Sequence, residues 1–216
     1  MSSALVIGGT GLVGSHLIDQ LITSNDYSSV VSLVRKNNRD SSRKLKEIVF
    51  DFENKDSIQH IKKAEHVFCC LGTTIKKAGS KSAFKFVDYD IPLLFGRWAE
   101  NISATSFSIV TAMGANPSSK IFYNRTKGLI EEEIKQLKIP TIQIFQPSLI
   151  TGKRKEFRAG EIAAKITFSF LNPLLIGKAK KYRPIAANTI AQGMLSELKK
   201  GKRGIAIIPS HLIGKE

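Results

Sequence analysis

The first two dozen residues constrain the fold of this chain more than any other segment. A short apolar run at residues 4–7 leads directly into a turn with four glycines, Gly8-Gly9-Thr10-Gly11-Leu12-Val13-Gly14. Residues 12–23 follow with apolar side chains at intervals of three and four, as on one face of an α-helix. A strand, a glycine-rich turn and an amphipathic helix in this order begin a βαβ unit, in which the two strands are parallel.

The same alternation continues along the chain. Short β-branched runs predict further strands at residues 30–34, 48–50, 66–71, 107–111 and 141–146, and helical patterns cover residues 80–100 and 123–138. Alternating strands and helices are typical of an α/β fold with a parallel sheet. The sequence contains no internal repeat and no linker, so we expect a single domain over residues 1–216.

The pattern changes after residue 150. A basic loop, an apolar helix at 162–171, a helix at 188–199 and a last strand at 205–208 follow. We expect residues 151–216 to form a small C-terminal lobe that closes over the substrate side of the sheet. The apolar helix has three alternative roles, which are core packing, a lid over a pocket, and contact with a membrane surface. Core packing combined with a lid is favoured.

The charge balance points to anionic partners. The 216 residues include 33 basic and 18 acidic ones, which gives a formal net charge of +15. Such an excess attracts nucleic acids, anionic lipids and phosphorylated small molecules. The basic clusters have no interleaved aromatic residues that could stack on bases, so nucleic acid is not favoured as a partner.

Cysteine and histidine usage excludes several kinds of site. Cys69 and Cys70 are adjacent, which gives neither a disulfide framework nor the spacing of a zinc site. The four histidines share no spacing, so we assign no metal. The N-terminal residues lack the leader of a signal peptide, and no stretch of about 20 apolar residues is present. These features predict a soluble, cytoplasmic protein.

The glycine-rich turn predicts a dinucleotide site. Glycines let the backbone turn tightly and approach a pyrophosphate, while the N-terminus of the helix offers free N–H groups and a partial positive charge. The alternative is a tight turn with a structural role alone. The position of the motif between a strand and a helix favours the dinucleotide.

The end of the second strand indicates which dinucleotide binds. NAD-binding domains usually carry an acidic residue there, which accepts a hydrogen bond from the ribose 2′-hydroxyl. Here Arg35 and Lys36 follow Val34, and a guanidinium suits a 2′-phosphate. NADP(H) is therefore favoured over NAD(H). Asp51, at the end of the third strand, either accepts from the adenine amino group or caps the turn after Phe50.

Tyr123 and Lys127 form a candidate catalytic pair. Their spacing of four places both side chains on one face of a helix. A phenol is a poor proton donor or acceptor at neutral pH, and a lysine ammonium one turn away stabilises its ionised form. Thr111 ends a strand at the carboxyl edge, where sites form in α/β sheets, and is expected to donate a hydrogen bond to a substrate oxygen.

These motifs occur together with others that span nearly the whole chain. They include Val49-Phe50-Asp51-Phe52, Lys77-Ala78-Gly79, Phe86-Val87-Asp88 and, as the most specific, Cys69-Cys70-Leu71-Gly72-Thr73-Thr74. With this set the chain resembles the atypical short-chain dehydrogenases/reductases, and within them the TIP30/CC3 family of Tat-interacting oxidoreductases. The resemblance implies a Rossmann-like, doubly wound parallel sheet with helices on both faces.

The resemblance also implies roles for individual residues. Tyr123 would be the proton donor, Lys127 its partner and a ligand of the cofactor ribose, and Thr111 the polarising hydroxyl. NADPH would lie across the carboxyl ends of the strands. The implied cofactor-binding residues are Gly8, Thr10, Gly11, Leu12, Val13, Gly14, Arg35, Asp51, Phe52, Leu71, Gly72, Thr73, Lys127 and Pro147.

Two positions depart from the family pattern. The hydroxyl residue is usually serine and here is Thr111, and the residue before Pro147 is often arginine and here is Gln146. The expected function is an NADPH-dependent oxidoreductase that transfers a hydride to a small carbonyl compound. The alternative is an NADP(H)-binding regulatory or adaptor protein without significant turnover. A homodimer and a peripheral membrane contact remain open alternatives for partners.

Overall fold

A single parallel sheet forms the centre of the molecule. The computed structural model describes residues 1–36, 42–61, 63–152 and 177–215, and in these ranges seven strands pair in the order β3-β2-β1-β4-β5-β6-β9. All six pairings are parallel. The strands are β1 (Ser2–Ile7), β2 (Tyr27–Val34), β3 (Leu45–Val49), β4 (His66–Cys69), β5 (Ser106–Val110), β6 (Thr141–Gln146) and β9 (Gly204–Pro209).

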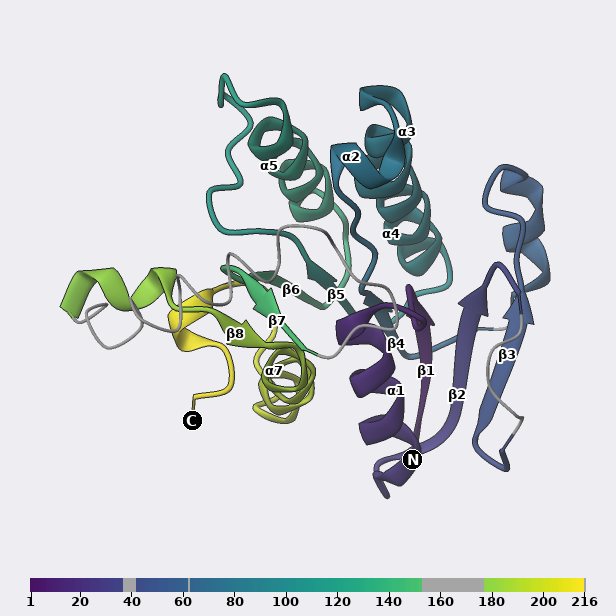
Figure 1. The fold of residues 1–216 in the computed structure, drawn as a ribbon. Coiled ribbons are helices and arrows are strands. Elements are labelled where there is room, and N and C mark those ends of the chain that lie inside the picture. The colour runs from purple at the N-terminus through teal and green to yellow at the C-terminus, as the bar shows by residue number, and fades with distance from the viewer. Residues whose placement is uncertain (37–41, 62, 153–176, 216) are drawn as a thin grey trace.

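Helices cover both faces of this sheet (Figure 1). One face carries α1 (Leu12–Thr23) and α7 (Ala187–Lys199), and the other carries α4 (Ile91–Asn101) and α5 (Phe122–Lys135). Strand β1 shows why, because its side chains from Ala4 to Ile7 are all apolar and buried, and successive side chains point to opposite faces. Burial on both faces is typical of a parallel sheet. The predicted doubly wound, Rossmann-like α/β fold is confirmed.

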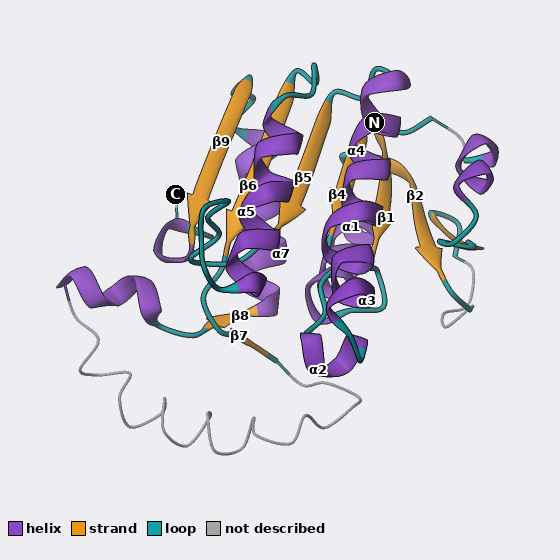
Figure 2. Ribbon diagram, turned by 90° about the horizontal axis from the view of Figure 1, so that it is seen from above, coloured by secondary structure: helices purple, strands orange, loops and turns teal. Residues whose placement is uncertain are grey.

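Strand β1, the third strand in the sheet, lies where the chain reverses its direction of winding. Strand β1 pairs with β2 on one side and with β4 on the other, so the connections leave it in opposite directions. Such a switch point leaves a crevice at the carboxyl ends of the strands, where ligands bind in open α/β sheets. Figure 2 shows the arrowheads of β5, β6 and β9 at this edge, with α2 (Ile75–Ala78) beyond it.

The helix expected at residues 80–100 is divided into three parts. It consists of α3 (Lys81–Lys85), a π-helical turn at Phe86–Asp90, and α4. A π-turn adds a residue to the helical repeat and rotates the side chains that follow. In this turn Asp88 is directed inward and is buried.

The described C-terminal residues divide between the main sheet, a helix packed on it and a small second sheet. The run predicted as its last strand forms β9, which pairs with β6 in the main sheet, and α7 packs on α1. Strand β9 joins the sheet because its backbone groups complete the hydrogen bonds of β6, which would otherwise be an open edge. Two short strands, β7 (Ile150–Thr151) and β8 (Ile185–Ala186), form a separate small sheet. The apolar helix predicted at 162–171 lies outside the described residues.

The remaining elements are short. Among the described residues they are three 3-10 helices, at Lys55–His60, Gly177–Tyr182 and Ser210–Leu212. In the ranges that the structure describes, no helix has both the length and the apolar character needed to cross a bilayer.

Candidate functional site

The glycine turn lies directly on the end of β4. Gly8 has a φ of +84°, and a Cβ built on it would lie 2.8 Å from the carbonyl carbon and oxygen of Cys70. A Cβ on Gly14 would lie 2.3 Å from the carbonyl oxygen of Gly8, so α1 begins in contact with the turn itself. Both positions exclude any side chain. The turn and the end of β4 are therefore fixed against each other.

The N-terminus of α1 is open toward the carboxyl edge of the sheet. Gly11 is exposed and is the N-cap residue, so no side chain there accepts from the first-turn N–H groups. Its own N–H donates to the carbonyl oxygen of Gly8 at 3.0 Å. Free N–H groups at a helix N-terminus bind phosphate oxygens. Thr10 is exposed next to Gly11, Leu12 is half-buried, and Val13 is buried behind them.

The residues expected around the adenosine follow β2 and β3, which are neighbours in the sheet. Arg35 is exposed directly after β2. Asp51 is exposed after β3, and its Oδ1 accepts from the backbone N–H of Glu53 at 3.0 Å, which is the turn-capping alternative. Phe52 is half-buried, with its ring centroid 4.9 Å from that of Phe50. Arg35 is thus the residue of this group whose side chain lies open to a ligand.

The loop after β4 meets α5 at a buried ion pair. Lys127 Nζ lies 2.7 Å from Asp88 Oδ1, and both side chains are almost completely buried, with 4% and 0% of their surface exposed. The other carboxylate oxygen of Asp88 accepts from the backbone N–H of Thr73 at 3.0 Å. A Cβ on Gly72 would lie 3.9 Å from Lys127 Nζ. The structure therefore brings Gly72, Thr73 and Lys127 together, next to the half-buried Leu71.

Asp88 keeps Lys127 charged. Burial lowers the pKa of the Lys127 ammonium, but the Asp88 carboxylate and Tyr123 offset this effect, and the net pKa is raised above its ordinary value. Sequence reasoning assigned Asp88 no role, although it lies within one of the family segments. Its inward direction depends on the π-helical turn, for which the sequence gives no periodic signal.

Tyr123 lies in the first turn of α5, one turn before Lys127. The Tyr123 side chain is half-buried, and its ring centroid is 5.4 Å from that of the fully buried Phe84. This ring contact limits the directions that the phenol can take. Tyr123 and Lys127 therefore occupy one side of α5, as their spacing predicts.

Thr111 is engaged by a carboxyl group that sequence reasoning missed. Its Oγ1 lies 2.5 Å from Glu131 Oε1 and 3.2 Å from the carbonyl oxygen of Phe145. Glu131 lies on α5, one turn after Lys127, and Gln146 Nε2 donates to both of its carboxyl oxygens at 3.1 and 2.9 Å. Burial raises the pKa of Glu131, although the bonds from Thr111 and Gln146 oppose this. The spacing of four from Lys127 is the one sequence signal for Glu131.

Pro147 follows β6 at the same edge of the sheet. Its carbonyl oxygen accepts from the backbone N–H of Met113 at 2.8 Å, which joins the segments that follow β5 and β6. The predicted site residues thus lie along the carboxyl ends of six adjacent strands and on the facing side of α5.

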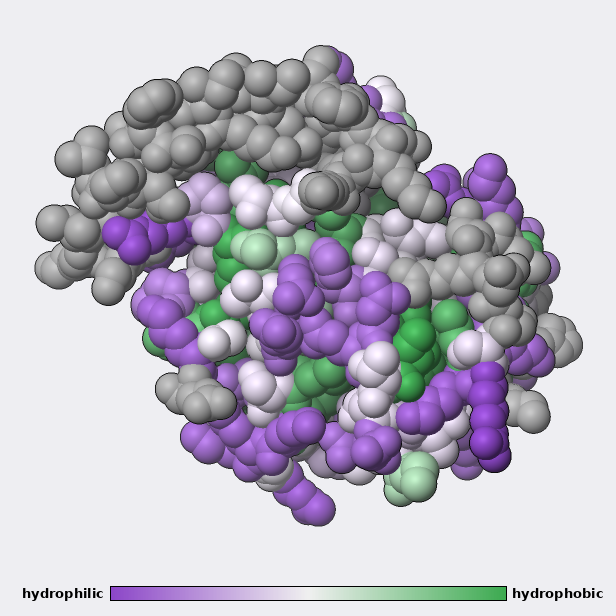
Figure 3. Space-filling view, turned by 60° about the horizontal axis from the view of Figure 1, so that its bottom comes forward, coloured by the Kyte–Doolittle hydropathy of each residue, from purple (hydrophilic) through white to green (hydrophobic). Residues whose placement is uncertain are grey.

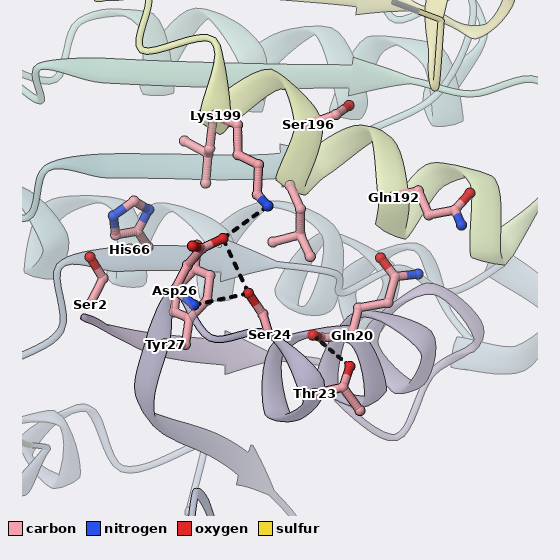
Figure 4. Close-up of a pocket in the computed structure, with 12 residues that line it drawn as sticks. Ser2, Gln20, Thr23, Ser24, Asp26, Tyr27, His66, Gln192, Ser196 and Lys199 are labelled. Atoms are coloured by element: carbon pink, nitrogen blue, oxygen red, sulfur yellow. Dashed lines mark hydrogen bonds and ion pairs between the residues drawn. The ribbon is translucent and has the colours of Figure 1, made fainter.

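A cavity of about 510 Å³ lies at the opposite, amino edge of the sheet. It is lined by the first residues of the strands, such as Ser2, Tyr27 and His66, and by the ends of α1 and α7 (Figure 4). Lys199 reaches across it to Asp26, at 2.9 Å. Figure 3 shows one face of the molecule, on which patches of hydrophobic residues lie between hydrophilic ones. This cavity contains none of the predicted site residues.

The buried ion pair generates a prediction about stability. Asp88→Asn leaves the Lys127 ammonium buried without a counter-charge, and breaking such a pair costs about 3–5 kcal/mol. Urea denaturation should show this loss, and adding Lys127→Met to Asp88→Asn should recover most of it. The matched control is Asp90→Asn, because Asp90 forms a half-exposed pair with Lys85 at 4.0 Å and such pairs contribute about 0–1 kcal/mol. Equal losses in the two single variants would contradict the assignment.

Comparison with known proteins agrees with this arrangement. Residues 4–91 match the model of the NAD dependent epimerase/dehydratase family. Protein HTATIP2 of Rattus norvegicus is 29% identical over 200 residues, which are 91% of this chain and 81% of that protein. The mitochondrial protein FMP52 of Candida albicans is 32% identical over 213 residues, which are 94% of this chain and 90% of that protein.

Solved structures share the fold at low sequence identity. The enzyme WbmH of Bordetella bronchiseptica in complex with NAD+ has a TM-score of 0.73 at 12% identity, over 97% of this chain and 76% of that one. A short chain dehydrogenase family protein of Francisella tularensis has a TM-score of 0.65 at 16% identity, over 96% of this chain and 97% of that one. The fold, the family model and the two full-length relatives agree, and the chain belongs to the HTATIP2 and FMP52 family of atypical short-chain dehydrogenases/reductases.

Proposed function

We propose that this protein is an NADPH-dependent oxidoreductase that reduces a small carbonyl compound. The observation that carries this proposal is the position of Tyr123 and the charged Lys127 on α5, beside the loop that follows β4. That loop begins where the glycine turn packs, so the catalytic pair and the dinucleotide site share one edge of the sheet. The WbmH structure, which has the same fold, contains NAD+.

The residues present fit a nicotinamide dinucleotide. Gly11 leaves space in front of the open N-terminus of α1, where the pyrophosphate would bind. Gly72 leaves space beside Lys127 Nζ, whose ammonium would donate to the ribose of the nicotinamide. Arg35 stands at the end of β2, where the adenosine ribose lies in this fold. A bound cofactor held by these residues would follow the carboxyl ends of the strands from β2 to β5.

The chemistry divides between cofactor and protein. A bound nicotinamide dinucleotide supplies the hydride for the carbonyl carbon. Tyr123 donates a proton to the carbonyl oxygen, and the neighbouring ammonium of Lys127 stabilises the phenolate that remains. Asp88 holds that ammonium in place and keeps it charged. Thr111 is the proposed polarising donor to the same oxygen, and its hydroxyl is held by Glu131 in the structure.

The contact between Thr111 and Glu131 also supports a second candidate function. A hydroxyl that donates its single hydrogen to Glu131 has none left for a substrate oxygen. In that state the protein would bind NADP(H) without significant turnover and act as a regulatory or adaptor protein. A screen of purified protein for NADPH consumption with a set of carbonyl compounds separates the two candidates. A cytoplasmic location stays a prediction, and the Candida relative is named mitochondrial.

Cofactor binding is tested at the glycine turn. NADPH binds only the folded state, so at about one hundred times its Kd it should stabilise the protein by about 2.7 kcal/mol and raise the Tm. Gly11→Val places a branched side chain where the pyrophosphate approaches, and this variant should lose the shift. Its Tm without NADPH serves as the control for folding. A folded Gly11→Val protein with an unchanged NADPH response would falsify the site.

The proton donor is tested at Tyr123. With a substrate found by the screen, Tyr123→Phe should lower turnover by ~10² or more and leave NADPH affinity nearly unchanged. Lys127→Ala should reduce both, because Lys127 has two roles. Tyr182→Phe is the matched control, since Tyr182 is exposed and is not one of the proposed site residues. Full activity in Tyr123→Phe would mean that the proton comes from another group.

The cofactor preference is tested at Arg35. A hydrogen bond to a charged group contributes ~1.5–3 kcal/mol, so NADPH should bind tens-fold more tightly than NADH. Arg35→Asp repels the 2′-phosphate and offers an acceptor to the 2′-hydroxyl, so it should reverse the preference. Fluorescence titration of both nucleotides measures the two ratios. Arg203→Asp, before β9, is the control with the same change in charge, and a similar reversal there would show a nonspecific field effect.

A further inference from the structure

The contacts around Glu131 require more hydrogens than an ionised carboxylate leaves available. Thr111 Oγ1 lies within hydrogen-bond distance of two acceptors, Glu131 Oε1 at 2.5 Å and the Phe145 carbonyl oxygen at 3.2 Å. A hydroxyl carries one hydrogen and can donate to one of them only. Both contacts become hydrogen bonds if Glu131 carries a proton, because the acid then donates to Thr111 and Thr111 donates to Phe145.

The surroundings of Glu131 are also those of a neutral acid. Glu131 is 3% exposed, and its direct partners, Thr111 and Gln146, are uncharged. The two ammonium groups on the same helix are held by other carboxylates, Lys127 by Asp88 at 2.7 Å and Lys135 by Glu132 at 2.9 Å. A buried carboxylate without a cation in contact is strongly disfavoured, and such a group takes up a proton.

We propose that Glu131 is a protonated positioning residue, whose carboxylic acid donates to Thr111 Oγ1 and thereby frees the hydrogen of Thr111. In the resting protein that hydrogen points to the Phe145 carbonyl, which already accepts the backbone N–H of Thr111 at 2.8 Å. It can therefore turn to a substrate oxygen and leave no backbone group unpaired. This step rests on the proposed function, because it makes Thr111 competent as the polarising donor.

The proposal explains what the uncharged residue at 146 does. A positive side chain at this position would lie against the Glu131 carboxyl, because Gln146 Nε2 is within 3.1 Å of both of its oxygens. That charge would favour the ionised form of Glu131, which accepts the hydrogen of Thr111. The neutral amide of Gln146 donates to Glu131 without removing the proton.

Two variants fix Glu131 in its two states. Glu131→Gln keeps an N–H donor toward Thr111 and imitates the protonated acid. Gln146→Arg supplies a guanidinium and imitates the ionised state. Infrared spectra are recorded at neutral pH without cofactor, and the spectrum of each variant is subtracted from that of wild type. The carbonyl stretch of a protonated carboxyl should be present in wild type and absent from both variants. Wild-type and Glu131→Gln spectra that are identical in this region overturn the proposal.

The direction of the hydrogen bond is tested at Thr111. Thr111→Val removes the acceptor of the Glu131 proton, so the carboxyl band should shift, and Thr111→Ser should restore its position. A band that does not respond to Thr111→Val overturns the step from Glu131 to Thr111. Neither spectrum needs a substrate, so failure of the proposed function, seen as an absence of turnover, is distinguishable from failure of this inference.

Stability gives an independent readout. The folded pKa of Glu131 is raised above the unfolded value of about 4.3, so the folded state holds the extra proton between the two values. Stability therefore falls as pH rises through this window, and Glu131→Gln does not share that loss. The unfolding constant of wild type should rise, relative to Glu131→Gln, by up to about tenfold per pH unit. If the ratio of the two unfolding constants stays the same from acid to neutral pH, the proposal is overturned. This measurement does not need Gln146→Arg, so it decides the question even if that variant fails to fold.

Discussion

The ion pair between Lys127 and Asp88 joins parts of the chain that are far apart in sequence. Asp88 comes from the π-helical turn before α4, Lys127 comes from α5, and the same carboxylate holds the N–H of Thr73 after β4. Neither charge is stable in the interior without the other. Because the glycine turn also packs on the end of β4, this pair sets the distance between the dinucleotide site and α5. The position of Tyr123 follows from it.

The sequence predicts those parts of the molecule whose signal is local. Periodicity identifies the helix at residues 12–23 with the ends that α1 has, and it identifies the seven described strands of the main sheet within a few residues. The glycine turn and Arg35 lie at strand ends, as their positions along the chain indicate. These features depend on neighbouring residues alone, and the parallel order follows because each helix must return the chain to the same edge.

The parts that sequence reasoning missed depend on contacts between distant segments. Asp88 and Glu131 both look like solvated positions of an amphipathic helix, and only the π-turn and the packing of α5 on β5 and β6 bury them. Strand β9 was expected in the C-terminal lobe that closes over the sheet, and its pairing with β6 has no local signal because it spans more than 60 residues. The sequence could not decide between two roles for Asp51, because turn capping and adenine binding require the same residue type. In the structure Asp51 caps the turn.

Helix α5 presents two buried carboxyl environments of opposite character to one site. Next to Lys127, the Asp88 carboxylate pairs with an ammonium and accepts a backbone N–H. One turn later, the Glu131 carboxyl meets a hydroxyl and an amide, and burial raises its pKa. Tyr123, Lys127 and Glu131 form one row at spacings of four, in which Asp88 raises the pKa of the lysine against the effect of burial and burial raises the pKa of the glutamate.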